Sequence, residues 1–324
     1  MNILITGGAG YIGSKVALDL INKNHRVFIV DNLISGKKLN IPKKCTFYKC
    51  DISNRSKILR IIEKNKIETV FHFAALISVG ESIKRPKTYI HNNYNKSKIF
   101  LNSCIKKKIK NFIFSSTAAA YGDPINDDPI KEDNLLKPLN PYGESKIKTE
   151  SYLQNELNCN YIILRYFNVA GADPQMRSGL ISKKPTHLIK IASEVAVGKR
   201  DEITIFGSDY STPDGTAIRD YIHVSDLANV HVKAVEYLFN KQKSNIINCG
   251  YGKGFSVKEV LNVFNEVNDQ PISIKTGERR AGDSSMLVSN VSKLHNLFDW
   301  KPKYNDLAFI IKTAIQWEKK LLNK

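Results

Sequence analysis

Tyr142 and Lys146 are the residues of this sequence whose types and spacing most clearly allow acid–base chemistry. They follow Asn140-Pro141, a pair typical of a helix start, and a spacing of four residues places both side chains on one helix face. A free phenol, with a pKa of about 10, is a poor base at neutral pH, but a neighbouring ammonium favours the phenolate. We predict that Tyr142 is a general base beside Lys146, although such a pair alone is more often an ordinary feature of a helix surface.

Ser116 is the third candidate for this chemistry, because it ends a strand predicted over residues 111–116. The carboxyl ends of parallel strands are where open α/β sheets bind their ligands. We predict that Ser116 shares a site with Tyr142 and Lys146. Together with the two cofactor motifs described next, the three residues favour a catalytic site over a surface pair.

A glycine-rich turn, Gly7-Gly8-Ala9-Gly10-Tyr11-Ile12-Gly13, stands between the first predicted strand and a helix. Glycines at positions 7, 10 and 13 permit a tight turn, a close approach of the backbone to a pyrophosphate, and tight packing of the helix on the strand. The helix N-terminus at Tyr11 supplies free N–H groups and the positive end of a dipole. This context predicts a dinucleotide-binding turn.

Asp31 indicates which dinucleotide would bind. It ends the second predicted strand, 18 residues after Gly13, where a carboxylate accepts hydrogen bonds from the adenosine ribose. Because a carboxylate repels a 2′-phosphate, the sequence predicts NAD rather than NADP. Asp51-Ile52 would meet the adenine or, alternatively, Asp51 would cap the helix that begins near Arg55. Phe73-Ala74-Ala75, which ends in small residues, suits a backbone that passes close to the cofactor.

Alternating strands and helices must position these residues in the first half of the chain. Continuous apolar runs predict buried strands at residues 2–6, 26–31, 47–50, 69–73, 111–116 and 160–165. Helical patterns are found at residues 11–23, 55–65, 81–108 and 141–157. This order predicts an α/β fold with a Rossmann-type doubly wound parallel sheet.

The pattern changes after Phe167 and predicts a smaller C-terminal α/β domain for the substrate. A polar loop over residues 172–186 precedes predicted helices at 187–197, 224–239, 256–267 and 307–321, with strands at 202–206, 245–248 and 286–289. We assign residues 1–166 and a return segment, 217–249, to the NAD-binding domain. Residues 167–216 and 250–324 would form the substrate-binding domain.

Composition narrows the class of protein. A chain of 324 residues, 42% hydrophobic and 25% charged, can bury a sizeable core and is not a disordered tail or a coiled-coil rod. No apolar run of about 18 residues predicts a membrane span, and a strand beginning at Asn2 leaves no room for a signal peptide. Five scattered cysteines without a CxxC pair argue against disulfides and against a bound metal. We therefore expect a cytoplasmic protein.

The net charge of +18 comes mainly from lysine, which supplies 39 of the 49 basic residues. Nucleic-acid sites usually concentrate basic and aromatic residues on one element, whereas these lysines are spread in twos and threes along the whole chain. We predict a solvated lysine-rich surface and no nucleic-acid partner. Such a surface would attract a polyanionic small substrate slightly.

Longer motifs show a resemblance to a known family. The matching stretches are GGAGYIGS (7–14), VDNL (30–33), HFAA (72–75), VGES (79–82), FSSTAAAYG (114–122), NPYGESK (140–146), RYFNVAGA (165–172), FGSDYSTPDGTAIRDYIHVSDLA (206–228) and RRAGD (279–283). By these motifs, which follow in order over almost the full length, the chain resembles the UDP-glucose 4-epimerase family of the extended short-chain dehydrogenase/reductase superfamily. The last two stretches separate nucleotide-sugar 4-epimerases from the wider superfamily.

The resemblance implies an isomerase of galactose metabolism that interconverts UDP-glucose and UDP-galactose through a 4-keto sugar, with NAD held tightly and regenerated in each turnover. Tyr142 would take the proton of the sugar 4-OH and later return it, and Ser116 would hydrogen-bond the same oxygen. Lys146 would also hold the ribose of the nicotinamide half. A homodimer that packs helices 81–108 and 141–157 of two subunits is expected from the family.

Two sets of binding residues follow from the resemblance. The cofactor would contact Gly7, Gly10, Tyr11, Ile12, Gly13, Asp31, Asn32, Asp51, Ile52, Phe73, Ala74, Ala75, Asn92, Tyr142, Lys146 and Phe167. The UDP-sugar would contact Ser116, Thr117, Ala118, Tyr142, Asn168, His187, Leu188, Arg219, Arg280, Asp283 and Leu287. Within this set, Arg219 and Arg280 would fork onto the diphosphate and Asp283 would accept the uridine ribose hydroxyls.

Four positions bear on how this chain differs from other members. Lys15 stands where the motif often has His, Ile77 where some members have a lysine near the nicotinamide ribose, and His187 where some have Asn. Leu287 stands four residues after the RRAGD aspartate, where a tyrosine closes the pocket of family members to an N-acetyl group. A leucine there would admit UDP-N-acetylglucosamine and its galacto partner, unless Leu287 only packs within its own strand.

Two other kinds of function remain open. Another nucleotide-sugar enzyme of this superfamily, such as a UDP-glucuronate 4-epimerase or a 4,6-dehydratase, would share the fold and the NAD step. A 4,6-dehydratase typically carries an Asp-Glu pair just after the serine or threonine, whereas residues 117–120 read Thr-Ala-Ala-Ala. A non-catalytic NAD sensor or an RNA-associated Rossmann protein would have no reason to retain Ser116, Tyr142 and Lys146 together.

Overall fold

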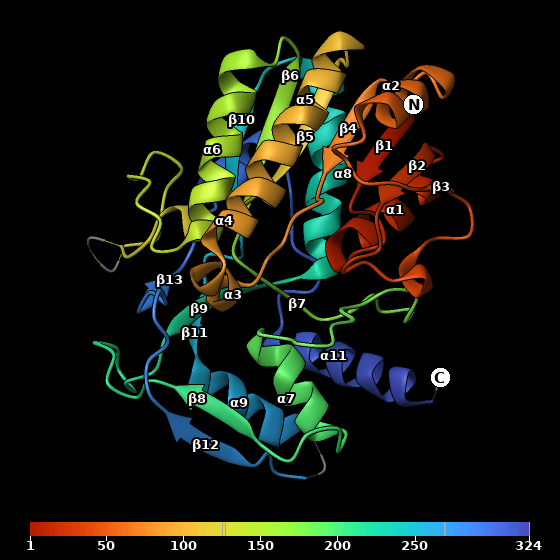
Figure 1. The fold of residues 1–324 in the computed structure, drawn as a ribbon. Coiled ribbons are helices and arrows are strands. Elements are labelled where there is room, and N and C mark those ends of the chain that lie inside the picture. The colour runs from red at the N-terminus through yellow and green to blue at the C-terminus, as the bar shows by residue number, and fades with distance from the viewer. Residues whose placement is uncertain (125, 127, 269, 324) are drawn as a thin grey trace.

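Seven parallel strands form the main sheet of the computed structural model, which describes residues 1–124, 126, 128–268 and 270–323. Their order is β10-β6-β5-β4-β1-β2-β3 (Figure 1). They span β1 (Asn2–Thr6), β2 (Arg26–Asp31), β3 (Thr46–Lys49), β4 (Thr69–His72), β5 (Asn111–Thr117), β6 (Asn160–Tyr166) and β10 (Asn245–Cys249). The order reverses between β1 and β4, which confirms the doubly wound sheet and marks where such sheets bind ligands.

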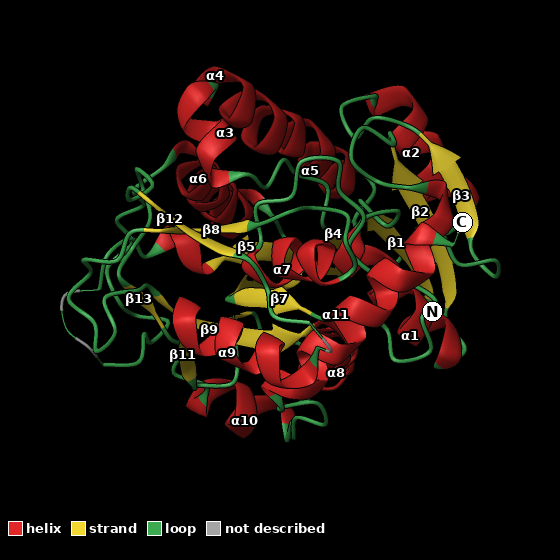
Figure 2. Cartoon of the chain, turned by 90° about the horizontal axis from the view of Figure 1, so that it is seen from below, coloured by secondary structure: helices red, strands yellow, loops and turns green. Residues whose placement is uncertain are grey.

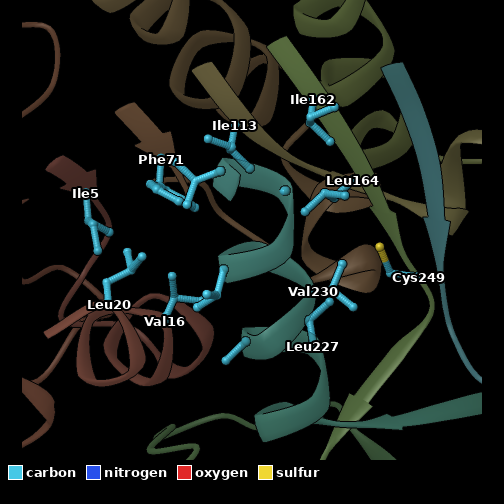
Figure 3. Close-up of a cluster of buried hydrophobic side chains, with 14 of the residues drawn as sticks. Ile5, Val16, Leu20, Phe71, Ile113, Ile162, Leu164, Leu227, Val230 and Cys249 are labelled. Carbon is cyan, nitrogen blue, oxygen red and sulfur yellow. The ribbon is translucent and has the colours of Figure 1, made fainter. Parts of the chain in front are cut away.

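Helices cover both faces of this sheet. One face packs against α1 (Tyr11–Asn22), α8 (Val224–Lys241) and α10 (Ser292–Phe298), and Figure 3 shows side chains of α8 meeting those of α1 and the strands. The other face packs against α2 (Arg55–Lys64), α5 (Lys96–Lys106) and α6 (Pro141–Glu156). Burial on both faces explains why the strands read as continuous apolar runs.

The helix predicted over residues 81–108 is wrong as one element. The structure has α3 (Val79–Lys84), α4 (Pro86–Tyr89), a π-helical segment at Ile90–Asn95 and then α5. Arg85 leaves the helical conformation, with φ −135° and ψ 55°, because the residue before a proline is kept from it. The break brings the π-helical segment, with Asn92 and Asn93, against α6.

The smaller C-terminal part contains two short sheets and three helices (Figures 1 and 2). One sheet joins β7 (Asn168–Ala170), β9 (Ile218–His223), β11 (Gly254–Ser256) and β13 (Met286–Leu287), and the other pairs β8 (Ile203–Phe206) with β12 (Ile274–Gly277). A separate apolar core forms here with α7 (Leu188–Ala196), α9 (Val257–Val267) and α11 (Leu307–Leu322). Sequence patterns did not predict β7, β9, β11, β12 or α10, because runs of three to seven residues are too short to show a period.

We keep the two-domain division as a proposal, with two adjustments from the packing. The strand β9 lies in the return segment 217–249, yet it belongs to the smaller sheet. Residues Leu294, Phe298 and Trp300 were assigned to the substrate domain, yet they pack in the core of the main sheet. The last residue of that assignment, 324, lies outside the described residues.

Candidate active site

The glycine-rich turn between β1 and α1 has the close backbone packing that its sequence predicts. Gly7 has a φ of 72°, and a Cβ on it would lie 2.7 Å from the Ala74 backbone nitrogen. A Cβ on Gly13 would lie 2.5 Å from the Gly7 carbonyl oxygen. The N-cap position of α1 is Gly10, which has no side chain to occupy the first N–H groups. These N–H groups and the dipole of α1 fit a pyrophosphate.

Asp31 lies directly beside this turn. Its carboxylate accepts hydrogen bonds from the Ala9 N–H at 3.1 Å and the Leu33 N–H at 2.8 Å, and burial raises the pKa of Asp31. A Cβ on Gly36 would lie 2.8 Å from both carboxylate oxygens, so the loop after β2 closes over the side chain. The position agrees with a carboxylate that meets the adenosine ribose next to the turn.

Asp51 forms the centre of a polar cluster instead of capping α2. Its carboxylate accepts hydrogen bonds from Asn32 Nδ2 at 3.0 Å, Lys96 Nζ at 2.8 Å and Ser53, and these bonds hold the pKa of Asp51 well below its usual range. The cap of α2 is Asn54, whose side chain accepts from the Lys57 N–H. The capping role considered for Asp51 is therefore wrong, while Ile52 is buried in the core.

The segment after β4 is fixed to the α6 helix by Asn93, which the sequence analysis did not single out. Asn93 accepts a hydrogen bond from the Leu76 N–H at 2.8 Å and donates to the Leu76 carbonyl oxygen at 2.9 Å and to Ser145 Oγ at 3.1 Å. Its neighbour Asn92 donates to the Asn93 side chain at 3.1 Å. Asn93 thus holds the backbone that follows Phe73-Ala74-Ala75 next to the helix of Tyr142.

The α6 helix begins as its sequence predicts. Pro141 occupies the first turn, and the Asn140 side chain caps it by accepting a hydrogen bond of 3.0 Å from the Gly143 N–H. Gly143 needs to be glycine, because a Cβ there would lie 2.5 Å from the Ala119 carbonyl oxygen. This contact brings the Tyr142 end of α6 against the end of β5.

Lys146 is buried, so the alternative of an ordinary surface pair is wrong. It is 3% exposed, and its ammonium donates a hydrogen bond of 2.6 Å to the Ser115 carbonyl oxygen. The ammonium also lies 4.9 Å from the centre of the Phe114 ring. Burial lowers the pKa of Lys146 to about 7, against the opposing effect of the Glu150 carboxylate.

Tyr142 is half-buried, and burial raises the pKa of its phenol. This direction is opposite to the one expected from a neighbouring ammonium, because the desolvation of the phenolate is the larger effect. The neighbouring Thr117 side chain lowers the pKa and partly offsets the rise. Thr117 also accepts a hydrogen bond of 3.1 Å from the Ala119 N–H, which fixes its orientation.

Ser116 does not have the orientation that we expected of a residue that shares the Tyr142 site. The Ser116 hydroxyl is buried and donates to the Glu150 carboxylate, which forms an ion pair with Arg165. The hydroxyl that stabilises the Tyr142 phenolate belongs to Thr117, the next residue. The strand was expected to end at residue 116 but continues through Thr117, which shifts the hydroxyl at the sheet edge by one position.

On the substrate side, His187 and Tyr11 line a small hollow of about 20 Å³ that also includes Gly171. The Tyr11 hydroxyl donates a hydrogen bond of 2.6 Å to the Gly171 carbonyl oxygen, and burial lowers the pKa of His187. His187 stands at the N-terminal end of α7, and Leu188 packs on the smaller core. The Tyr11 hydrogen bond therefore joins the start of α1 to the residue that follows β7.

The two arginines of the substrate set have different surroundings. Arg280 is exposed, and its guanidinium carbon lies 3.7 Å from the centre of the Phe206 ring. Arg219 on β9 instead donates to the carbonyl oxygens of Ile218 at 2.8 Å and Ser284 at 2.6 Å. In this structure Arg219 thus holds the segment that follows Asp283, and Arg280 is the better placed of the two for a diphosphate.

Leu287 belongs to an apolar wall beside the Tyr142 site. It packs against a small buried cluster, and β13 places it opposite Arg219 on β9. The cluster comprises Ala118, Tyr121, Ile130 and Phe167. Two of these residues, Ala118 and Phe167, were expected from the family pattern, so Leu287 lies among predicted binding residues as well as in its own strand.

Lys15 and Ile77, which differ from the family pattern, differ in burial. Lys15 is 4% exposed and pairs with Asp19 and with Asp173, whose carboxylate lies 3.6 Å away, so it ties α1 to the loop after β7. Ile77 is 52% exposed.

Within residues 1–124, 126, 128–268 and 270–323 there is no helix long and apolar enough to cross a membrane and no cluster of residues suited to hold a metal ion.

Comparisons with known proteins show which family the chain resembles over most of its length. The model of the NAD dependent epimerase/dehydratase family matches residues 3–250. The UDP-glucose 4-epimerase of Halalkalibacterium halodurans is 43% identical, over 98% of this chain and 96% of its own length. The Stenotrophomonas maltophila UDP-glucose-4-epimerase, solved with NAD and formylated UDP-arabinopyranose, superposes with a TM-score of 0.95 at 32% identity, over 100% and 99% of the two chains. The UDP-Glc/GlcNAc 4-epimerase of Campylobacter jejuni superposes with a TM-score of 0.85 at 42% identity, over 98% and 99%.

Proposed function

The chain belongs to the NAD dependent epimerase/dehydratase family, and from this premise we propose that it is an isomerase that interconverts UDP-glucose and UDP-galactose. Relatives of that activity match almost its full length. The observation that carries the proposal is that α6 brings Tyr142 and Lys146 to the end of β5, where Lys146 donates to the Ser115 carbonyl oxygen and Thr117 lies beside Tyr142.

The residues of the cofactor side fit NAD. The uncapped N-terminus of α1 would hold the pyrophosphate, and Asp31 would hold the adenosine ribose, where its charge excludes a 2′-phosphate. When bound, NAD takes a hydride from C4 of the sugar and gives it back. Asp51, Asn92 and the backbone after β4 would complete the cofactor side.

Tyr142 would move the proton. As C4 is oxidised, the phenolate accepts the proton of the 4-OH, and the sugar becomes a 4-keto sugar. After the keto sugar has turned in the pocket, C4 is reduced on its opposite face and Tyr142 returns the proton to the oxygen. No proton or electron pair is gained or lost over the cycle, so the product differs from the substrate only at C4.

Thr117 and Lys146 would make this transfer possible. Burial raises the pKa of Tyr142 and so opposes formation of the phenolate. The Thr117 side chain lowers the same pKa. Lys146, one helical turn away from Tyr142, adds a positive charge when its amine is protonated. We assign to Thr117 the hydrogen bond to the sugar 4-oxygen that the sequence analysis gave to Ser116.

The substrate side would bind a nucleotide diphosphate. Arg280 carries an exposed guanidinium that matches a diphosphate in geometry and charge, and its neighbour Asp283 could accept the ribose hydroxyls of the uridine. His187 and Asn168 border the same region from α7 and β7. Arg219 supports this side by holding the segment after Asp283.

The structure favours epimerisation over 4,6-dehydration. Elimination of water across C5 and C6 needs an acid and a base beside those carbons. The turn after Thr117 is Ala118–Ala120, a 3₁₀ turn without a carboxylate, and it occupies the place where a dehydratase typically has its Asp-Glu pair.

We extend the proposal to N-acetylated UDP-sugars. Leu287 has neither the ring nor the hydroxyl of a tyrosine, and it packs in the apolar cluster with Ala118 and Phe167. A leucine at that position takes less volume than a tyrosine and would offer an apolar surface to an acetyl methyl group. The Campylobacter jejuni relative is described as an epimerase of both UDP-Glc and UDP-GlcNAc, which supports this extension.

The expected assembly and location also stay proposals. We propose a cytoplasmic homodimer in which α5 and α6 of one subunit pack on those of the other. An isoleucine on α5, Ile99, is 38% exposed and would be covered in such a dimer. Light scattering on the eluting protein would give twice the mass of one chain, and a monomer mass at micromolar concentration would contradict the dimer.

Turnover of UDP-galactose by the purified protein tests the proposed function. Formation of UDP-glucose without added cofactor is expected, since NAD would remain bound through purification. UDP-glucuronate serves as the comparison substrate, because a UDP-glucuronate 4-epimerase would prefer it.

A further inference from the structure

Three successive residues at the end of β5, 115–117, meet one face of α6. The carbonyl oxygen of the first accepts a hydrogen bond from Lys146, the hydroxyl of the second donates to Glu150, and the side chain of the third lies beside the Tyr142 phenol. The three helix residues are spaced by four, so they form one row along α6. The register of this row against β5 decides which hydroxyl faces the Tyr142 phenol.

Glu150 is the residue of this row that forms a buried ion pair with β6. Its carboxylate is 2% exposed and accepts two hydrogen bonds from the Arg165 guanidinium, at 3.1 Å from Nε and 2.7 Å from Nη2. Ser116 and Arg165 are direct partners in the pairing of β5 with β6, so Glu150 ties α6 to two adjacent strands. A buried carboxylate held bidentately by a guanidinium has a fixed geometry.

Arg165 is itself held in place on its far side. Its Nη1 donates to the Tyr121 hydroxyl at 2.9 Å and to the Glu132 carbonyl oxygen at 3.1 Å. Tyr121 in turn donates to the Asn248 side chain at 2.7 Å. The position of Glu150 is therefore fixed by a network that reaches from β6 to β10 and that does not include Tyr142 or Lys146.

The charge of Glu150 also acts on Lys146, one helical turn away. The titratable or polar groups that face the Lys146 ammonium are Glu150 on α6, His72 on β4, and the Ser115 carbonyl oxygen and Phe114 ring on β5. Burial lowers the pKa of His72 to about 3, and Thr6 and Ser97 hydrogen-bond its two nitrogens, so His72 is neutral. Glu150 is the group in this set that supplies a negative charge.

We propose that Glu150 is a positioning residue for the epimerase reaction: it fixes the register that brings Tyr142 to Thr117, and its charge keeps Lys146 an ammonium. The inference rests on the proposed function, because turnover is its readout. Without the Glu150 charge, the pKa of Lys146 would fall further below its ordinary value. Because a lysine is charged only below its pKa, the ammonium would then be lost at a lower pH than in the wild type.

The test compares Glu150→Gln, which removes the charge and keeps the shape, with Glu150→Asp, which keeps the charge. The kcat and KM for UDP-galactose are measured for both holoenzymes and the wild type from about pH 6 to pH 9. We expect Glu150→Gln to lose more kcat at the alkaline end than at the acidic end, because its Lys146 ammonium is lost at a lower pH. The KM should stay near the wild-type value, and Glu150→Asp should keep the wild-type pH profile.

Either of two outcomes would overturn the inference. The first is a Glu150→Gln variant with the wild-type kcat at every pH. The second is an equal loss of kcat at every pH in both variants, which would indicate a structural role only. If circular dichroism shows that Glu150→Gln does not fold, the double variant with Glu150→Gln and Arg165→Met is used instead. It removes both buried charges, and we expect the same shift in its pH profile. An inactive wild type that retains NAD would refute the proposed function instead, so the two failures are distinguishable.

Discussion

The Lys146 ammonium donates a hydrogen bond of 2.6 Å to the Ser115 carbonyl oxygen, and this bond fixes the middle of α6 against the end of β5. With Lys146 at that point, Tyr142 lies one turn earlier, at the edge of the sheet, and Thr117 is the hydroxyl residue beside it. The account of the reaction depends on this alignment of helix and strand.

NAD is expected to co-purify with the protein. The turn at Gly7, Gly10 and Gly13 and the carboxylate of Asp31 would bind it, and the proposed reaction requires that the hydride is returned before the cofactor leaves. Protein denatured after purification should release close to one nicotinamide dinucleotide per chain. Protein that is folded and yet releases none would contradict the cofactor assignment.

Tyr142→Phe should remove most of the activity while NAD binding is unchanged. The phenol supplies the proton transfer, and loss of a general base typically costs about 10²–10⁴-fold in rate. The measurement is kcat with UDP-galactose alongside the NAD content of the variant. A rate near that of the wild type would show that another group moves the proton.

Thr117→Val should reduce kcat far more than Ser116→Ala does, by roughly tenfold or more for one lost hydrogen bond to a charged group. Thr117 stabilises the Tyr142 phenolate, whereas Ser116 donates to Glu150. The two variants are matched, since each removes one hydroxyl from adjacent residues of one strand. The reverse ranking would restore the catalytic role that the sequence analysis gave to Ser116.

Leu287→Tyr should depress turnover of UDP-N-acetylglucosamine much more than turnover of UDP-glucose. The tyrosine ring would fill the space beside Ala118 and Phe167 that an N-acetyl group needs. Leu287→Met, with a similar volume, is the control and should leave the ratio of the two rates unchanged. If the ratio is also unchanged in Leu287→Tyr, or if the wild type does not turn over the acetylated sugar, Leu287 has no part in specificity.

The sequence predicts the cofactor side well because its signals are local. Gly7 and Gly13 are needed where the backbone leaves no room for a Cβ, and Asp31 ends a strand whose apolar run is plain. Asn93, in contrast, acts from a π-helical segment that the break at Pro86 makes possible, and no periodic pattern indicates it.

The choice between Ser116 and Thr117 shows where sequence reasoning stops. Both are hydroxyl residues at the end of β5, and an error of one residue in the strand end exchanges their places. A tertiary contact separates their roles: the Ser116 hydroxyl donates to Glu150, which forms an ion pair with Arg165. Glu150 and Arg165 lie 34 and 49 positions further along the chain. Strand ends are the least certain part of such predictions.

The most direct test of the central claim is to incubate purified protein with UDP-galactose, without added NAD, and to follow both sugars by chromatography. The account predicts that UDP-glucose forms until the two sugars reach a constant ratio, and that the same ratio is reached from UDP-glucose. It also predicts that Tyr142→Phe protein, with its NAD still bound, forms little product in the same time. Folded, NAD-containing wild-type protein that leaves UDP-galactose unchanged would contradict the account.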